Sequence, residues 1–153
     1  MLRAKINDAL KEAMKSQDKS RVSTLRLVNA AVKNADIEAR GQGKEALEDD
    51  AILGVLQKMI KQRQESAELY DKGGRPELAA KEREEIEVIS SYLPTQMSDL
   101  EAGTVIQAIV HEINAQGLKD MGRTMTALKE RFAGRMDFAK ASAKVKDLLG
   151  GSR

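Results

Sequence analysis

The stretch that decides the fold is Asp120-Met-Gly-Arg-Thr-Met-Thr-Ala-Leu-Lys-Glu-Arg-Phe-Ala-Gly-Arg135. Apolar side chains recur in it at helical spacing, at Met121, Met125, Leu128 and Phe132. Asp120 is a residue type that begins helices, and Gly134 is one that ends them. The basic residues avoid the apolar stripe, so the pattern predicts an amphipathic helix with one buried side.

Two more short helices are expected around this one. Ser98-Asp-Leu-Glu101 has the spacing of a capping box and opens an apolar-striped helix to about residue 115, where Gly117 signals its end. Asp137 is expected to cap a last helix that reaches about residue 149. Three short helices with short joints predict a three-helix bundle over residues 94–153.

The sequence before this bundle predicts four longer helices, at about 2–16, 21–40, 49–72 and 76–92. Ser20 is the expected cap of the second helix, and Asp49 or Asp50 that of the third. The second helix carries apolar residues on two sides, with Leu27 and Ile37 on the less regular one, so both sides are expected to be covered. Pro94 disfavours helix in the residue before it, which predicts an N-terminal helical domain over residues 1–93. With helices expected on both sides of this boundary, the sequence predicts an all-α protein.

The third and fourth helices form a hairpin about Gly73-Gly74, with Pro76 in the first turn of the fourth. Arg63 and two glutamates, Glu82 and Glu85, fall within the apolar stripes of these helices. Charges on a buried stripe are costly unless they are paired. We therefore predict that Arg63 pairs with Glu82 or Glu85, as a contact that sets the register of the hairpin.

Composition excludes several kinds of chemistry. The 153 residues contain no Cys and one His, so thiolate nucleophiles and Cys-ligated zinc are excluded, and transition-metal binding has few ligands. No phosphate-binding loop, dinucleotide fingerprint or nucleophile elbow occurs. We predict no catalytic site, no metal and no cofactor, and no membrane span or leader, in a cytoplasmic protein.

Positive charge gathers at the C-terminal end. From Gly117 onward nine Lys and Arg face four acids, a net +5. Six of these residues are candidates for binding an RNA backbone: Arg123, Lys129, Arg131, Arg135, Lys140 and Lys144. No aromatic residue accompanies them for base stacking, so binding would rest on shape and charge. The alternative is that these residues form ordinary solvated faces.

Several motifs together resemble one known family. They are Leu10-Lys11-x-Ala13-Met14-Lys15, Thr24-Leu25-Arg26-Leu27, Lys61-Gln-Arg-Gln-Glu-Ser66, Gly74-Arg75-x-x-Leu78, Tyr92-Leu-Pro94, Asp120-Met-Gly-Arg-x-Met125 and Gly134-Arg135. In this order they resemble the GatB/YqeY family of small bacterial proteins. The resemblance implies two helical units, the second similar to the tail domain of the GatB subunit of glutamine-dependent aminoacyl-tRNA amidotransferase, a tail that helps to hold tRNA.

The resemblance leaves three functions open. The first is a tRNA-associated accessory or adaptor protein that uses the basic C-terminal surface. The second is a protein interaction module without nucleic-acid binding. Its partner would be a protein of the tRNA-amidation or translation machinery, docked on the second helix and on the face formed by residues 61–66. The third is a carbon–nitrogen ligase with glutamine as amido-N-donor, an activity that the family label implies but for which the sequence offers no nucleophile and base.

Overall fold

The structure is a computed structural model that describes residues 1–151. The described residues form α-helices, a 3-10 turn and a π-helical turn with no strand, which confirms the all-α prediction. Contacts divide the chain into two compact units, Met1–Pro94 and Thr95–Arg153. The expected junction lies one residue before this division.

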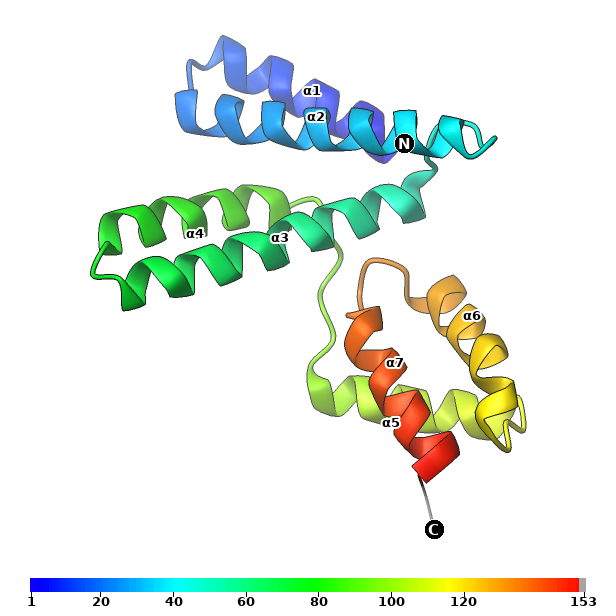
Figure 1. The fold of residues 1–153 in the computed structure, drawn as a ribbon. Helices are drawn as coiled ribbons and strands as arrows, with labels where there is room; N and C mark the ends of the chain where they lie inside the picture. The colour runs from blue at the N-terminus through cyan, green and yellow to red at the C-terminus, as the bar shows by residue number, and fades with distance from the viewer. Residues whose placement is uncertain (152–153) are drawn as a thin grey trace. The chain divides into compact units, whose positions relative to one another are not determined.

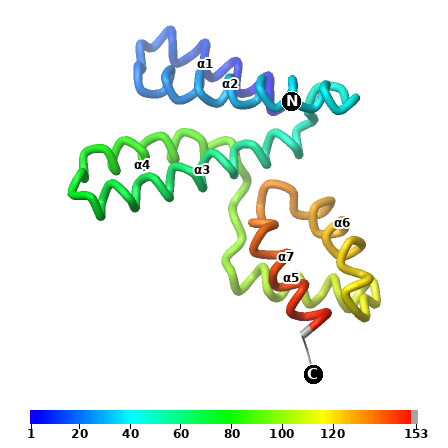
Figure 2. Tube along the Cα trace, viewed as in Figure 1, coloured from blue at the N-terminus to red at the C-terminus, as the bar shows by residue number. Residues whose placement is uncertain are grey.

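The first unit consists of two helical hairpins (Figure 1). The helices α1 (Leu2–Lys15) and α2 (Lys19–Gly41) form one, and α3 (Asp49–Lys72) and α4 (Pro76–Ser90) form the other. Figure 2 shows the trace reversing between the members of each pair. The reversal between α3 and α4 uses Gly74 at φ 73°, a left-handed conformation in which a side chain would be strained.

The core of this unit is aliphatic. Its most buried residues come from all four helices and include Ile6, Leu25, Val28, Ile52, Leu56 and Ile89. One side of α2 supplies Leu25, Val28 and Val32 to this core, as its stripe predicted. The second side does not follow the prediction, because Leu27 is 45% exposed and Ile37 is 57% exposed. Helix α2 is therefore buried on one side only.

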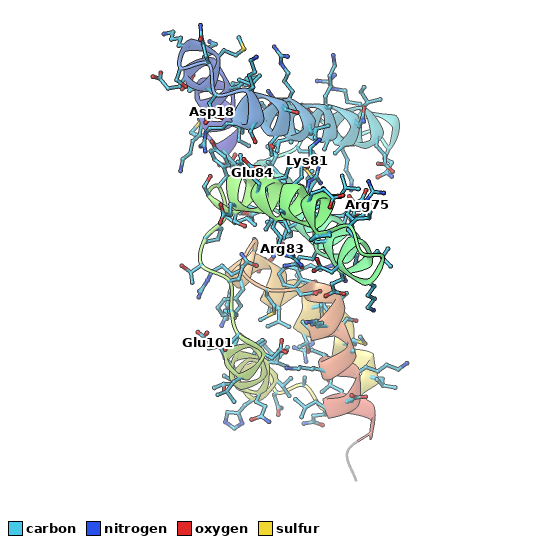
Figure 3. All side chains as sticks on the ribbon, turned by 90° about the vertical axis from the view of Figure 1, so that its left-hand side faces the viewer. Asp18, Arg75, Lys81, Arg83, Glu84 and Glu101 are labelled. Atoms are coloured by element: carbon cyan, nitrogen blue, oxygen red, sulfur yellow. The ribbon has the colours of Figure 1, made fainter. Side chains whose placement is uncertain are left out.

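Two of the expected caps are wrong. Helix α2 begins two residues earlier than a Ser20 cap would place it, because its cap is Asp18 (Figure 3), whose carboxylate accepts a hydrogen bond from the Arg21 N–H. Ser20 lies inside the helix and donates instead to Glu84 of α4 at 3.0 Å. In α3 the capping position is Glu48, whose side chain makes no capping bond, and Asp49 and Asp50 form the first turn.

The second unit contains α5 (Asp99–Glu112), the 3-10 turn η1 (Leu118–Asp120), α6 (Met121–Phe132), α7 (Phe138–Lys146) and the π-helical turn η2 (Asp147–Gly151). Ile106, Ile109, Leu128 and Val145 form the centre of its core. The capping box of Ser98 and Glu101 and the Asp137 cap are confirmed. Helix α5 ends at Glu112, earlier than the expected residue 115, and Asn114, not Gly117, takes the left-handed conformation after it, at φ 54°.

Candidate nucleic-acid interface

The motif that begins at Asp120 is first of all a turn. The Asp120 carboxylate accepts the Gln116 N–H at 2.9 Å and pairs with Arg123 at 3.1 Å. The Gln116 contact points backward along the chain and the Arg123 contact joins two side chains. The Asp120 side chain makes no capping bond to the backbone of α6, contrary to its expected role. The Gln116 N–H is the main cause of a lowered pKa at Asp120, and Arg123 adds to it. Asp120 therefore closes the 116–120 turn as a carboxylate.

The candidates on α6 differ in how they are held. Arg123 also donates to the Ile113 carbonyl at 3.3 Å, and Arg131 pairs with Glu112 at 2.6 Å. Both therefore contact the C-terminal end of α5. Lys129 is exposed, and its side chain has no hydrogen bond or ion pair with the rest of the described chain. Two of the three basic side chains on this helix are thus engaged in holding the bundle together.

The Gly134-Arg135 pair ties the start of the unit to its middle. Arg135 Nε donates to the Thr95 carbonyl at 3.2 Å, and the Arg135 carbonyl accepts the Met97 N–H at 2.9 Å. The Gly134 carbonyl accepts a bond from the Gln96 side chain, with Gly134 at φ 78°. Arg135 also contributes to lowering the pKa of Glu101 at the start of α5, after the larger effect of Ser98 (Figure 3). This pair accordingly anchors residues 95–97.

The last two candidates meet at the other end of α5. Lys144 Nζ donates to the Asp99 carbonyl at 3.1 Å, and Lys140 Nζ lies 4.0 Å from the Asp99 carboxylate. Together with Arg135 they line a hollow of ≈ 120 Å³. The carboxylates of Asp99 and Asp137 line it too, so the hollow is only weakly positive. We call this group of three cations the Arg135–Lys144 cluster, made of Arg135, Lys140 and Lys144.

The six candidates do not form one surface. Asp99 and Glu112, the first and last residues of α5, are about 20 Å apart along the helix axis. The Arg135–Lys144 cluster gathers at the first, whereas Arg123 and Arg131 contact the last turn. At the start of α7, Asp137 already accepts the N–H groups of Ala139 and Lys140, so these two are not available to a phosphate.

In the first unit the structure places Arg63 against Glu85, one of its two expected partners, at 2.9 Å. Arg63 also donates to the Met59 carbonyl at 3.2 Å. Glu82, the other expected partner, is half-buried on α4 and receives no bond from Arg63. The pair lies at the seam of the α3–α4 hairpin, as a contact that sets its register would.

Sequence reasoning missed a buried carboxylate in the first unit. Asp36 is 7% exposed and receives two bonds from Arg3, at 2.7 and 3.0 Å, and one from the Leu47 N–H at 2.9 Å. Arg3 in turn donates to the Leu47 carbonyl at 3.1 Å. The Arg3 bond and then the Leu47 bond hold the pKa of Asp36 below its ordinary value. The signal in the sequence is that Asp36 follows Val32 by four residues on the buried stripe of α2.

The described residues offer little for catalysis. His111 is exposed at the end of α5, and no group of three His, Asp or Glu side chains within residues 1–151 is arranged to hold a metal ion. None of the described helices is long and apolar enough to cross a membrane.

Comparison with known proteins gives the family. Residues 3–149 match the model of the Yqey-like protein family. A relative from Lachancea thermotolerans, "Altered inheritance of mitochondria protein 41, mitochondrial", is 38% identical over 59% of this chain and 46% of its own length. The protein of the same name from Eremothecium gossypii is 30% identical over 73% of this chain and 61% of its own length. That from Pyrenophora tritici-repentis is 28% identical over 92% of this chain and 77% of its own length.

The chain spans about half the length of the first two of these relatives, 46% and 61%. Their shared name places those proteins in mitochondria and mentions no nucleic acid. Since the family model covers nearly the whole chain, this protein belongs to the YqeY-like protein family.

Proposed function

We propose that this protein is an accessory protein that contacts tRNA through its C-terminal unit, at the Arg135–Lys144 cluster. One observation supports it most directly, which is that three cations, from the turn before α7 and from α7 itself, line one hollow at the start of α5 and α7. A phosphate group binds between cations spaced in this way, and the contact needs no base stacking.

The proposal is narrower than the surface expected from the sequence. Arg123 and Arg131 are paired at the far end of α5, and Arg135 carries a structural bond to Thr95. Lys140 and Lys144 are therefore the two side chains that an incoming phosphate would use most readily. Their bonds to Asp99 are a long ion pair and a single carbonyl contact, both of which can exchange for phosphate.

The test is binding of labelled tRNA to the full chain at several salt concentrations. Lys140→Glu with Lys144→Glu should abolish a salt-sensitive complex, and Lys140→Ala with Lys144→Ala should lower the slope of log affinity against log salt by about 2. The matched control is Lys58→Glu on α3 with Lys81→Glu on α4 (Lys81 is labelled in Figure 3), which makes the same charge change on two exposed lysines. Absence of tRNA binding by the unaltered chain at low salt would overturn the proposal.

A pull-down from lysate with and without RNase separates this function from a protein interaction module. Recovery of tRNA that RNase abolishes supports the proposal, whereas one stoichiometric protein that survives RNase supports the module. Cell fractionation then decides between the cytoplasm, expected from the sequence, and the mitochondrion, which the relatives' name suggests.

A further inference from the structure

The first unit carries an open hollow that the proposed RNA contact does not use. It lies where the end of α1 meets the first half of α2, with a volume of ≈ 720 Å³. Its lining includes Met14, Lys19, Val22, Ser23, Arg26 and Leu27. We call it the α1–α2 hollow.

The floor of the hollow is apolar and exposed. Met14 is 48% exposed and Leu27 is 45% exposed, although both belong to helices whose opposite sides are well packed. Val22, which is partly buried, also lines the hollow. A methionine thioether adapts to differently shaped apolar partners. The floor is therefore suited to receiving apolar side chains from another molecule.

The lining of the hollow also carries two cations that form no ion pair with a described residue. These cations are Lys19 and Arg26, and the Arg26 guanidinium contacts the Met14 sulfur at 4.0 Å. Asp18, which directly precedes Lys19, accepts the Arg21 N–H as the cap of α2. Arg21 is different, because it donates to the Tyr92 hydroxyl at 2.8 Å.

From this combination we infer that the α1–α2 hollow docks an acidic amphipathic helix of a partner protein. Apolar residues on one side of such a helix would cover Met14 and Leu27, and its flanking Glu or Asp side chains would meet Lys19 and Arg26. An RNA backbone would use the cations but leave the apolar floor in water. The inference concerns the other unit and does not depend on the proposed tRNA contact.

The test uses a fluorescent helical peptide of about 15 residues, with leucines at i, i+4 and i+7 and glutamates on the flanks. The second probe has the same leucines with lysine in place of every glutamate. Anisotropy titrations with the full chain should show binding of the acidic peptide that weakens with salt, and no binding of the basic one. No binding of the acidic peptide, or equal binding of both, would overturn the inference.

Variants then locate the binding site. Leu27→Asp should weaken binding at least about tenfold, because it places a charge in the apolar floor and repels the acidic flanks. Lys19→Glu with Arg26→Glu should also weaken it and remove the salt dependence. Leu69→Asp on α3, where the leucine is 69% exposed, is the control and should bind normally. Circular dichroism checks that each variant is folded. An unchanged affinity for Leu27→Asp would contradict the docking site.

Other occupants give different results. If the unaltered chain pellets with phosphatidylserine vesicles and Leu27→Asp does not, the hollow binds a membrane surface and the inferred partner helix is wrong. Self-association that Leu27→Asp abolishes would replace it by a second copy of this chain. Displacement of the acidic peptide by tRNA would mean that both ligands compete for one site, and it would contradict the inference of a separate docking site in the first unit.

Discussion

Arg63 of α3 and Glu85 of α4 are joined by a 2.9 Å bond in a place where each side chain is only 14% exposed. The two residues are 22 positions apart in sequence and meet because the turn at Gly73-Gly74 brings their helices together. Two charges so far removed from water stabilise the hairpin only as a pair.

Removing one member of this pair should therefore cost more than removing both. Glu85→Ala leaves the Arg63 guanidinium buried and unpaired and should lower the free energy of unfolding by about 1–3 kcal/mol. Replacing both residues together, by Arg63→Met and Glu85→Leu, should recover most of the loss. Urea unfolding followed by circular dichroism measures both. Glu77→Ala, which breaks the exposed pair with Arg75, should leave the midpoint unchanged and serves as control.

Acid should weaken the first unit through Asp36. Because Arg3 and the Leu47 N–H lower its folded-state pKa, its contribution to stability is present above the unfolded-state pKa and disappears as the pH falls through the folded-state value. Asp36→Asn should destabilise the protein at neutral pH and flatten the acid side of its stability curve. Thermal melts from neutral to strongly acidic pH test this, with exposed Asp8→Asn as the control. If the melting temperature of both variants falls equally steeply with decreasing pH, the prediction is wrong.

Asp120→Ala should open the turn before α6. The change removes the acceptor of the Gln116 N–H and frees Arg123 from its ion pair. Amide exchange at Gln116 should accelerate about tenfold, while exchange at Leu56 in the first unit should not change. Because the carboxylate has a lowered pKa, acid should produce the same acceleration in the unaltered protein as the pH falls through that pKa.

Two glycines should respond in opposite directions to alanine. Gly134→Ala places a side chain at φ 78° and should lower the free energy of unfolding by about 1–2 kcal/mol. Gly54→Ala lies inside α3, with no atom within 4 Å of the added methyl group, and should raise it by about 0.5–1 kcal/mol. Differential calorimetry measures both. Equal shifts of the same sign would contradict the assigned backbone roles.

The helices were predictable because their apolar stripes are local. Leu25, Val28 and Val32 are spaced as a buried side of a helix requires, and they are buried. Helix ends were harder, because Asp18 and Ser20 are both good capping residues within the same turn and backbone geometry decides between them. Asn114 likewise provided the left-handed residue that Gly117 was expected to provide.

The candidate interface was less predictable for a different reason. Whether a basic side chain is available depends on carboxylates and carbonyls from other helices, such as Glu112 for Arg131 and Asp99 for Lys144. A count of charges along the chain contains no information on these partners. Asp36 was missed for the converse reason, since a carboxylate on a buried stripe is recognisable only when its partner Arg3, 33 positions away, is known.

The bonds of Arg3 and Asp36 to Leu47 have a practical consequence for the connection between α2 and α3. They fix both backbone groups of Leu47, so the exposed residues 42–46 run between two anchored ends. Lengthening such a segment costs only the entropy of closing a longer loop, about 0.6 kcal/mol for each doubling. The N–H groups of residues 42–44 bond to the last carbonyls of α2, so an insertion there would disturb the end of that helix. Residues 45 and 46 are thus a position where an epitope tag or a fluorescent reporter can be inserted without breaking these bonds.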